Sequence, residues 1–371
     1  MYDLDNYEPV ARIVVIGVGG AGSNAVNRMI DDNINAVEFY VANTDRQALA
    51  TSKSPNRLVL GEDLTEGLGA GGEPSVGKQA AEASSEDIRN IVRGANMVFI
   101  VAGMGGGTGT GAAPVIARIA KEEGALTIAI VTRPFTFEGK KRIAHSVEGL
   151  NELKNAVDSI IIVSNDKLLM VNGTVPISEA FSEADRVLAQ SVRTVTDLIL
   201  MPAVINLDFA DVRNTLKDSG IALIGFGIGS GPSKAQDAAQ NAISSPLLEA
   251  SINGARRAIC AVTCGKAVTL YEAQTTVDHI IEAAGGQLDV KFGVSINDQL
   301  DDQIIVSVIA SDFDKDFDFT VVPSYDKPFK TKSMEEINID NNDNKSISEE
   351  KNDDNIADDI LPNFLKGINI D

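Results

Sequence analysis

Short apolar runs alternate with longer amphipathic segments along the first half of the chain. Runs rich in β-branched residues predict strands at residues 12–17, 37–45, 97–103, 126–132 and 159–165. Apolar residues at helical spacing predict helices between them, at residues 21–30, 77–93, 114–123 and 140–156. This alternation predicts a Rossmann-like α/β domain whose parallel sheet is covered by helices on both faces. Ligands of such sheets bind beyond the carboxyl ends of the strands.

The pattern changes after one long helical segment, which is predicted at residues 178–200 and ended by Pro202. Strand-like runs then follow at residues 221–229, 257–265, 288–296 and 302–311, with helical segments at 235–243 and 275–284. Because helices are fewer per strand here, we expect a second, smaller α+β domain. The long central helix would join the two domains.

The composition shifts abruptly after Asp312. Residues 333–355 are mainly Asn, Asp, Glu, Lys and Ser, too polar to bury a core, which predicts a disordered acidic linker. Apolar residues return near the end of the chain, at Ile360, Leu361, Phe364 and Leu365. A short apolar peptide on a disordered arm is typical of a docking motif, although a frayed tail fits the composition equally well.

Length and charge narrow the class of protein. The chain has 371 residues, 44% of them hydrophobic but only 5% aromatic, which predicts two domains with aliphatic cores. Its formal net charge of −21 argues against binding nucleic acid or anionic lipid through a basic surface. No apolar stretch approaches the ~20 residues of a membrane span, and the acidic N-terminus lacks the apolar region of a secretory signal. We therefore expect a cytosolic protein.

The two cysteines, Cys260 and Cys264, lie four residues apart in a strand-like run. With only two histidines in the whole chain, this pair makes a poor zinc site. We expect buried, reduced thiols and no metal site built from protein side chains.

Glycine-rich loops suggest where chemistry takes place. Residues 98–120 read as a buried strand, a loop with six glycines between Gly103 and Gly111, and a helix, which is the arrangement that binds phosphate at a helix N-terminus. The segment GVGGAG at residues 17–22 follows another strand and fits the dinucleotide fingerprint, with Asp45 further on as the ribose-binding acid. That fingerprint alone supports an NAD-dependent oxidoreductase as the alternative function.

A third glycine loop, GLGAGG at residues 67–72, favours a different ligand. One pyrophosphate needs one glycine turn, whereas several loops that converge on one crevice suit a triphosphate, whose greater charge needs more N–H donors. The next segment, with Lys78, is not a P-loop, because Gln79 replaces the magnesium-binding Ser or Thr and no strand precedes it.

The motifs together resemble those of the tubulin/FtsZ family of GTPases. The loop GGGTGTG at residues 105–111 is similar to the family signature. Over residues 8–312 the family's other motifs occur in the family's order, among them GVGGAGSNAVNRMI, TRPFTFEGKKR, AFSEADRVL and NLDFADVR. LPNFLK at residues 361–366 is similar to the family's C-terminal peptide. The resemblance implies a cytoplasmic GTPase that assembles head to tail into filaments and forms a ring at the division site.

The resemblance also implies residue roles at a site for GTP or GDP. Its nucleotide-binding residues would be Gly19, Gly20, Ala21, Gly22, Ser23, Asn24, Asn43, Thr44, Ala70, Gly71, Gly72, Gly103, Gly105, Gly106, Gly107, Thr108, Gly109, Thr110, Gly111, Thr132, Pro134, Glu138, Arg142, Asn165, Phe181 and Asp185. Among them, Asn165 and Asp185 would read the guanine edge and Phe181 would stack on the ring. For Glu138 and Arg142, a surface salt bridge between residues four apart fits the spacing equally well.

Catalysis is implied for Asp208 and Asp211, which would enter the nucleotide pocket of the next subunit and position the attacking water. Spacing alone favours helix capping by these acids instead. Mg²⁺ would be held by the phosphates and water, and residues 359–366 would bind membrane-tethering and regulatory partners. The expected division of the chain is an extension (1–10), a GTP-binding domain (11–177), the central helix (178–200), a catalytic loop and helix (201–219), the α+β domain (220–312), the linker (313–357) and the terminal peptide (358–371).

Overall fold

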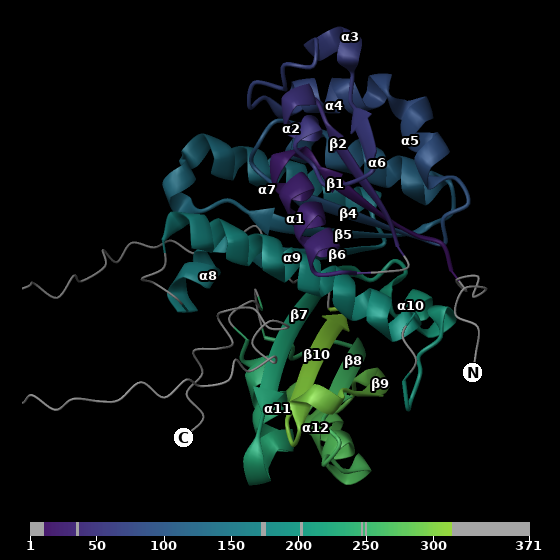
Figure 1. Cartoon of the computed structure of the whole chain (residues 1–371), viewed down its shortest axis with the longest axis vertical. Coiled ribbons are helices and arrows are strands. Elements are labelled where there is room, and N and C mark those ends of the chain that lie inside the picture. Colours follow the sequence, from purple (N-terminus) through teal and green to yellow (C-terminus); the bar gives the residue numbers. More distant parts are fainter. Residues whose placement is uncertain are drawn as a thin grey trace, which may run out of the picture.

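The computed structural model describes residues 11–34, 37–171, 176–200, 203–245, 248 and 251–313. Ten strands in this part of the chain form one continuous sheet in the order β3-β2-β1-β4-β5-β6-β7-β10-β8-β9. Figure 1 shows the helices α4, α5, α6 and α7 around the first six strands, and α11 and α12 beside the last four. The predicted mixed α/β class is confirmed.

The first six strands are parallel throughout. They are β1 (Ile13–Val18), β2 (Glu38–Asn43), β3 (Asn56–Val59), β4 (Met97–Gly103), β5 (Leu126–Arg133) and β6 (Ser159–Ser164). All but β3 coincide with predicted strands. The local pattern gives little sign of β3, because it has four residues and begins with the polar pair Asn56 and Arg57 at the edge of the sheet.

Three short connecting helices, at residues 46–50, 62–65 and 165–171, were not predicted, and two predicted helices have clearly different bounds. The connecting helices are α1 (Gly19–Asp31), α2 (Arg46–Ala50), α3 (Glu62–Thr65), α4 (Pro74–Ala83), α5 (Ser85–Val92), α6 (Thr108–Glu122), α7 (Lys140–Ala156) and α8 (Asn165–Val171). The helix predicted at 77–93 breaks at Ser84, whose hydroxyl accepts a hydrogen bond from the N–H of Gly61. The helix predicted at 114–123 begins six residues earlier, so the end of the glycine loop is helical.

The first turn of α6 packs closely against α4. A Cβ added to Gly111 would lie 1.9 Å from the carbonyl oxygen of Pro74, so only glycine allows the two helices to approach this closely. Gly111 thus serves helix packing inside α6.

The second half is a mixed sheet, as expected for an α+β unit. Its elements are α9 (Ile177–Leu200), α10 (Phe209–Leu216), β7 (Gly220–Gly229), α11 (Lys234–Ile243), β8 (Arg257–Cys264), α12 (Leu270–Ala283), β9 (Asp289–Ile296) and β10 (Ile304–Ser311). Strand β10 runs antiparallel to both β7 and β8, while β7 continues the parallel sheet from β6. The predicted linker and terminal peptide lie outside the described residues, apart from Phe313.

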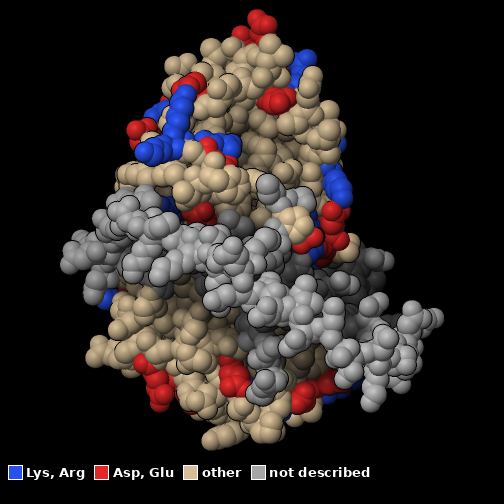
Figure 2. Space-filling view, turned by 90° about the vertical axis from the view of Figure 1, so that its left-hand side faces the viewer, with Lys and Arg blue, Asp and Glu red and all other residues tan. Residues whose placement is uncertain are grey.

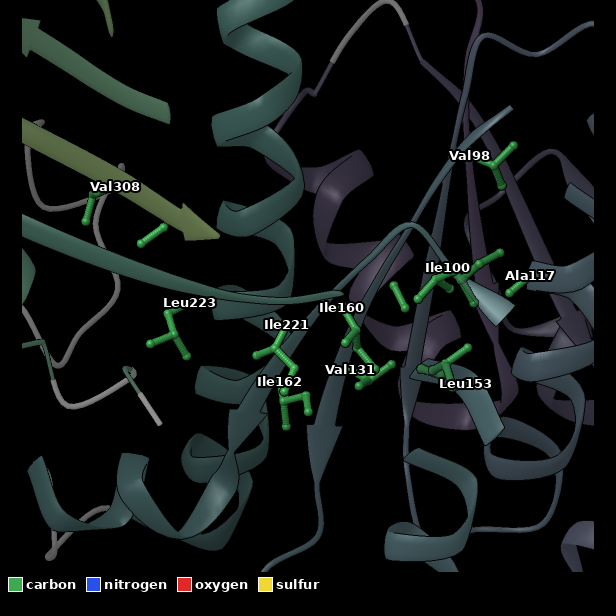
Figure 3. Packing of buried hydrophobic residues seen from close by; sticks show 14 of the residues in the cluster. Val98, Ile100, Ala117, Val131, Leu153, Ile160, Ile162, Ile221, Leu223 and Val308 are labelled. Carbon is green, nitrogen blue, oxygen red and sulfur yellow. The ribbon is translucent and has the colours of Figure 1, made fainter. Parts of the chain in front are cut away.

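Two aliphatic layers cover the two faces of the sheet. Alternate residues of β4 enter opposite layers, with Val98 and Ile100 in one and Phe99 and Val101 in the other. Figure 3 shows the first layer, where side chains from β4, β5 and β6 pack with Ala117 of α6 and Leu153 of α7. Cys260 and Cys264 are buried free thiols, as predicted.

Charged side chains are distributed unevenly over the surface. Figure 2 shows basic and acidic groups side by side over the upper part of one face, and mainly acidic groups along its lower edge. This agrees with the strongly negative net charge of the sequence.

Candidate nucleotide site

A cavity of about 720 Å³ opens at the carboxyl ends of the parallel strands. It is bounded by the segments that follow β1, β4, β5 and β6, by a loop before α4 and by the start of α9. The lining residues are Val18, Gly19, Gly20, Ala21, Asn24, Gly71, Gly72, Gly103, Met104, Gly105, Gly106, Gly107, Thr108, Gly109, Thr132, Pro134, Glu138, Lys141, Arg142, His145, Asn165, Phe181, Ala184 and Asp185. The crevice thus lies where α/β sheets bind ligands.

Two helix N-termini point their backbone donors at this cavity. Helix α1 begins at Gly19 and α6 begins at Thr108, and both residues line the cavity. Neither helix has a side-chain hydrogen bond at its N-cap or an acidic residue in its first turn. The first N–H groups of each helix are therefore available to an anion, which the helix dipole also favours.

Two glycines show why these loops need glycine. Gly105 has a φ of 102°, a conformation that side chains disfavour. At Gly22, an added Cβ would lie 2.3 Å from the carbonyl oxygen of Val101, so this glycine lets α1 pack closely on β4. Gly105 thus shapes the glycine-rich loop after β4, and Gly22 allows α1 to lie close to that strand.

Several residues from the sequence prediction do not line the cavity. They are Gly22, Ser23, Asn43, Thr44, Ala70, Thr110 and Gly111. The Thr44 hydroxyl lies 2.7 Å from the hydroxyl of Thr108, and Thr110 accepts a hydrogen bond of 2.8 Å from the N–H of Gly105. Thr44 and Thr110 therefore support residues of the cavity wall.

The far end of the cavity has the features of a base site. Asn165 is the first residue of α8, and its Oδ1 is buried and accepts no hydrogen bond from any described residue. Phe181 of α9 is 41% exposed and meets Phe135 edge to face, with ring centroids 5.1 Å apart. Burial raises the pKa of Asp185 to about 7, against the opposing effect of Arg28. An aromatic face beside two oxygen acceptors suits a planar base with N–H donors.

Glu138, just before α7, and residues of α7 itself contribute ionisable side chains to the end of the cavity beside the glycine loops. Glu138 and Arg142 form an ion pair, and both line the cavity, so the salt bridge and the cavity position occur together. Lys141 and His145 also line it, although the sequence prediction did not include them. Their spacing of four residues on a predicted helix was the available signal that they share one face.

The acids Asp208 and Asp211 do not line this cavity. Asp208 caps α10, where its Oδ1 accepts a hydrogen bond of 2.7 Å from the N–H of Asp211. Figure 1 shows α8 and α10 at opposite ends of α9. From Asp185 to the last residue of α9, the helix rises about 22 Å. The capping geometry expected from spacing is therefore present, at a distance from the cavity of the same chain.

The features that suggested other nucleotide motifs have different partners. Asp45 caps α2 by accepting hydrogen bonds from the N–H groups of Gln47 and Ala48, and it does not line the cavity. This position does not suit a ribose-binding acid. Lys78 forms an ion pair with Glu152 on α7, 2.9 Å apart and outside the cavity, so it does not act as a P-loop lysine.

The described residues contain neither a membrane-spanning helix nor a cluster of metal ligands. None of their helices is long and apolar enough to span a bilayer. Nor do their His, Cys, Asp and Glu side chains gather into a group that could hold a metal ion.

Comparison with known proteins agrees with this geometry. Residues 12–173 match the model of the Tubulin/FtsZ family GTPase domain, and residues 220–314 match that of the FtsZ family C-terminal domain. An empty FtsZ dimer from M. jannaschii is 38% identical, with a TM-score of 0.75 over 81% of this chain and 88% of that one. A point mutant of M. jannaschii FtsZ is also 38% identical, with a TM-score of 0.78 over 82% and 91%.

A structure of lower sequence identity has a similar fold. CetZ2 from Haloferax volcanii, in a GTPγS-bound protofilament, is 21% identical, with a TM-score of 0.68 over 81% of this chain and 92% of that one. At that identity the likeness concerns the fold alone. The family models and the M. jannaschii structures show that this chain belongs to the tubulin/FtsZ family of cytoskeletal GTPases, which bind guanine nucleotides and hydrolyse GTP.

Proposed function

We propose that the protein hydrolyses GTP in sites that two copies of the chain complete together, stacked head to tail in a filament. The observation that carries this proposal is the separation of Asp208 and Asp211 from the cavity of their own chain. Carboxylates at the other end of α9 can serve a neighbour's cavity but not their own. A contact between two different surfaces of the same chain repeats without closing and builds an open filament.

The relatives support the same arrangement. The M. jannaschii FtsZ structure is a dimer and the CetZ2 structure is a protofilament. In the protein described here, the cavity would form one half of the contact and the α10 end would form the other half.

The nucleotide would lie with its phosphates on the N-termini of α1 and α6. Their uncapped N–H groups supply donors, and Thr108 adds a hydroxyl that Thr44 holds in place. The loop of Ala70, Gly71 and Gly72 would border the terminal phosphate. At this end the carboxylate of Glu138 is paired with Arg142, and the other side-chain oxygens are neutral ones such as those of Asn24 and Thr108, so Mg²⁺ would be held mainly by phosphates and water.

Guanine would fill the far end of the cavity. The carboxylate of Asp185 can accept from both N1–H and the 2-amino group, a pair of donors that adenine lacks. The buried Oδ1 of Asn165 offers a further acceptor, and Phe181 presents a ring for stacking.

Hydrolysis would depend on positioning. Asp208 and Asp211 of one copy would hold the attacking water in line with the terminal phosphate in the next copy's cavity, while Mg²⁺ would neutralise developing charge. GTP would favour assembly, and loss of its terminal phosphate would weaken the contact, so the filaments would turn over.

The cellular role follows from family membership and from the end of the sequence. We propose a filament ring at the division site in the cytoplasm. Residues 359–366 would bind membrane-tethering and regulatory division proteins, and residues 313–357 would act as a flexible spacer.

The direct test is phosphate release from GTP with Mg²⁺ over a series of protein concentrations. A shared site predicts a lag below a threshold and a steep rise above it. Mixing Asp211→Ala with Asp185→Ala, each inactive alone, should restore about a quarter of wild-type turnover, because each cavity meets one neighbour's acid pair at random. Specific activity that is independent of concentration, with no rescue on mixing, would contradict the shared site.

A further inference from the structure

The two strongly basic side chains on the cavity wall are both held by carboxylates. Among the described lining residues these are Lys141 and Arg142 on α7. Lys141 forms an ion pair with Glu73, and Arg142 forms one with Glu138. The cavity thus has two positive charges at the end beside the glycine loops, each paired with a negative charge.

The two pairs connect different parts of the wall. Glu138 and Arg142 lie four residues apart, so their pair stays within one segment. Glu73 comes directly after Gly71 and Gly72 and is the N-cap residue of α4. The Glu73–Lys141 pair therefore fastens the loop before α4 to α7, across the cavity.

This loop packs against Gly107 on one side, but two of its glycines leave open space on the other side. Gly71 and Gly72 have φ values of 58° and 78°, and an added Cβ at either position would meet no atom within 4 Å. The side chains of Lys141 and Glu73 are 69% and 48% exposed. An ion pair so open to water is weak and can be exchanged for a stronger anion at little cost.

We propose that Lys141 exchanges between Glu73 and the terminal phosphate of GTP, so that this pair fastens the loop before α4 only when that phosphate is absent. The inference rests on the proposed placement of the phosphates. With GTP bound, Lys141 turns to the phosphate and leaves Glu73 unpaired beside an anion, which repels the loop. With GDP bound, Lys141 returns to Glu73. Lys141 is thus a specificity-determining residue for GTP over GDP, and Glu73 opposes that preference.

The test measures dissociation constants for GDP and for GTPγS at protein concentrations below assembly. The readout is the ratio of the two dissociation constants, because a variant that weakens the binding of both nucleotides equally leaves this ratio unchanged. Lys141→Gln should lower the preference for GTPγS by about five- to tenfold and change GDP affinity less than about twofold. Glu73→Gln should raise that preference by about two- to fivefold in the wild-type background and clearly less in Lys141→Gln, where only the repulsion between Glu73 and the phosphate is relieved.

A second ion pair between α4 and α7, away from the cavity, provides a matched control. Lys78 of α4 pairs with Glu152 of α7, with side chains 45% and 53% exposed. Lys78→Gln and Glu152→Gln should leave the ratio unchanged. Protection of residues 69–76 from hydrogen exchange should be greater with GDP than with GTPγS in the wild type, and equal in Glu73→Gln.

The outcomes separate this inference from the function on which it rests. If the variants change both affinities equally, or if Glu73→Gln acts the same with and without Lys141, the exchange is wrong. If Asp185→Ala and Gly20→Ala bind both nucleotides as the wild type does, the proposed placement of the nucleotide is wrong instead.

Discussion

The carboxylate of Asp208 accepts a hydrogen bond from the N–H of Asp211 over 2.7 Å and so caps the helix that carries both acids. A cap needs only an acceptor, whereas positioning a water for attack on a phosphate also uses negative charge. Asn supplies the acceptor without the charge, and Ala supplies neither. The two roles of Asp208 can therefore be separated by substitution.

Asp208→Ala should lower the free energy of unfolding by about 1 kcal/mol, while Asp208→Asn should change it by only a few tenths. Both variants should lose GTP turnover by about 100-fold or more, because the neighbour's water is no longer held in place. Urea unfolding measures the first effect, and phosphate release above the assembly threshold measures the second. Full turnover in Asp208→Asn would leave this residue with the capping role alone.

Asp185 gives nucleotide binding a dependence on pH. Burial raises the pKa of Asp185 to about 7, so below that pH the side chain is protonated and loses its ability to accept two hydrogen bonds. Affinity for GDP should rise with pH by about tenfold per unit up to about pH 7 and then level off. Isothermal titration between pH 5.5 and 8 measures this.

Asp185→Asn is the matched control, because its amide does not titrate while every other group in the cavity is retained. Its GDP affinity should be weaker than that of the wild type at pH 8 and should lack the rise around pH 7. Identical pH profiles for the two proteins would show that Asp185 does not read the base.

The strand positions follow from the sequence because runs such as Met97–Gly103 are buried on both faces and contain little except apolar residues. Helix boundaries are predicted less well from the sequence where tertiary contacts determine them. Ser84 breaks a continuous helical pattern because its hydroxyl bonds to Gly61, 23 residues away in the sequence. No local pattern carries that information.

The cavity was predicted best where it is built from backbone. The glycine loops after β1 and β4 identify themselves by composition, and both line the cavity. Lys141 and His145 were missed because lysine and histidine on a helix usually face solvent, and only the position of α7 relative to the loops places them here. Thr44 was placed on the wall by resemblance, whereas the structure places its hydroxyl against Thr108.

Two neighbouring glycines of α1 should respond to alanine in opposite ways. At Gly22 the added Cβ would lie 2.3 Å from the oxygen of Val101, so Gly22→Ala should destabilise the fold by about 1–3 kcal/mol. At Gly20 no atom lies within 4 Å of the added Cβ, and the residue lines the cavity. The free energy of unfolding of Gly20→Ala should lie within about 0.5 kcal/mol of the wild-type value. Its affinity for GDP and GTPγS should be at least about tenfold weaker.

Urea midpoints and nucleotide titrations on the same two variants test this pair. Normal nucleotide affinity in Gly20→Ala would mean that the phosphates do not approach the start of α1. Wild-type stability in Gly22→Ala would mean that α1 can move away from β4 without loss.

Lys121, at the end of α6, joins a buried carboxylate before β6 to an exposed one between α10 and β7. Asp158 is only 3% exposed, and its Oδ2 accepts a hydrogen bond of 2.9 Å from the N–H of Thr127. Lys121 lies 3.0 Å from Oδ1 of Asp158 and 2.9 Å from Oδ1 of Asp218. The bond to Lys121 lowers the pKa of Asp218. Lys121 thus neutralises one buried and one exposed acid.

Lys121→Met should lower the free energy of unfolding by about 1–3 kcal/mol, because it leaves Asp158 buried without its cation. Adding Asp158→Asn to Lys121→Met should cost less than the sum of the single changes, since the unpaired charge is then gone. Lys53→Met is the control, because the pair of Lys53 with Asp31 has side chains 54% and 49% exposed and should contribute under about 1 kcal/mol. Urea unfolding of the single and double variants at fixed GDP concentration measures these differences. Equal losses for Lys121→Met and Lys53→Met would mean that water solvates Asp158 as well as Lys121 does.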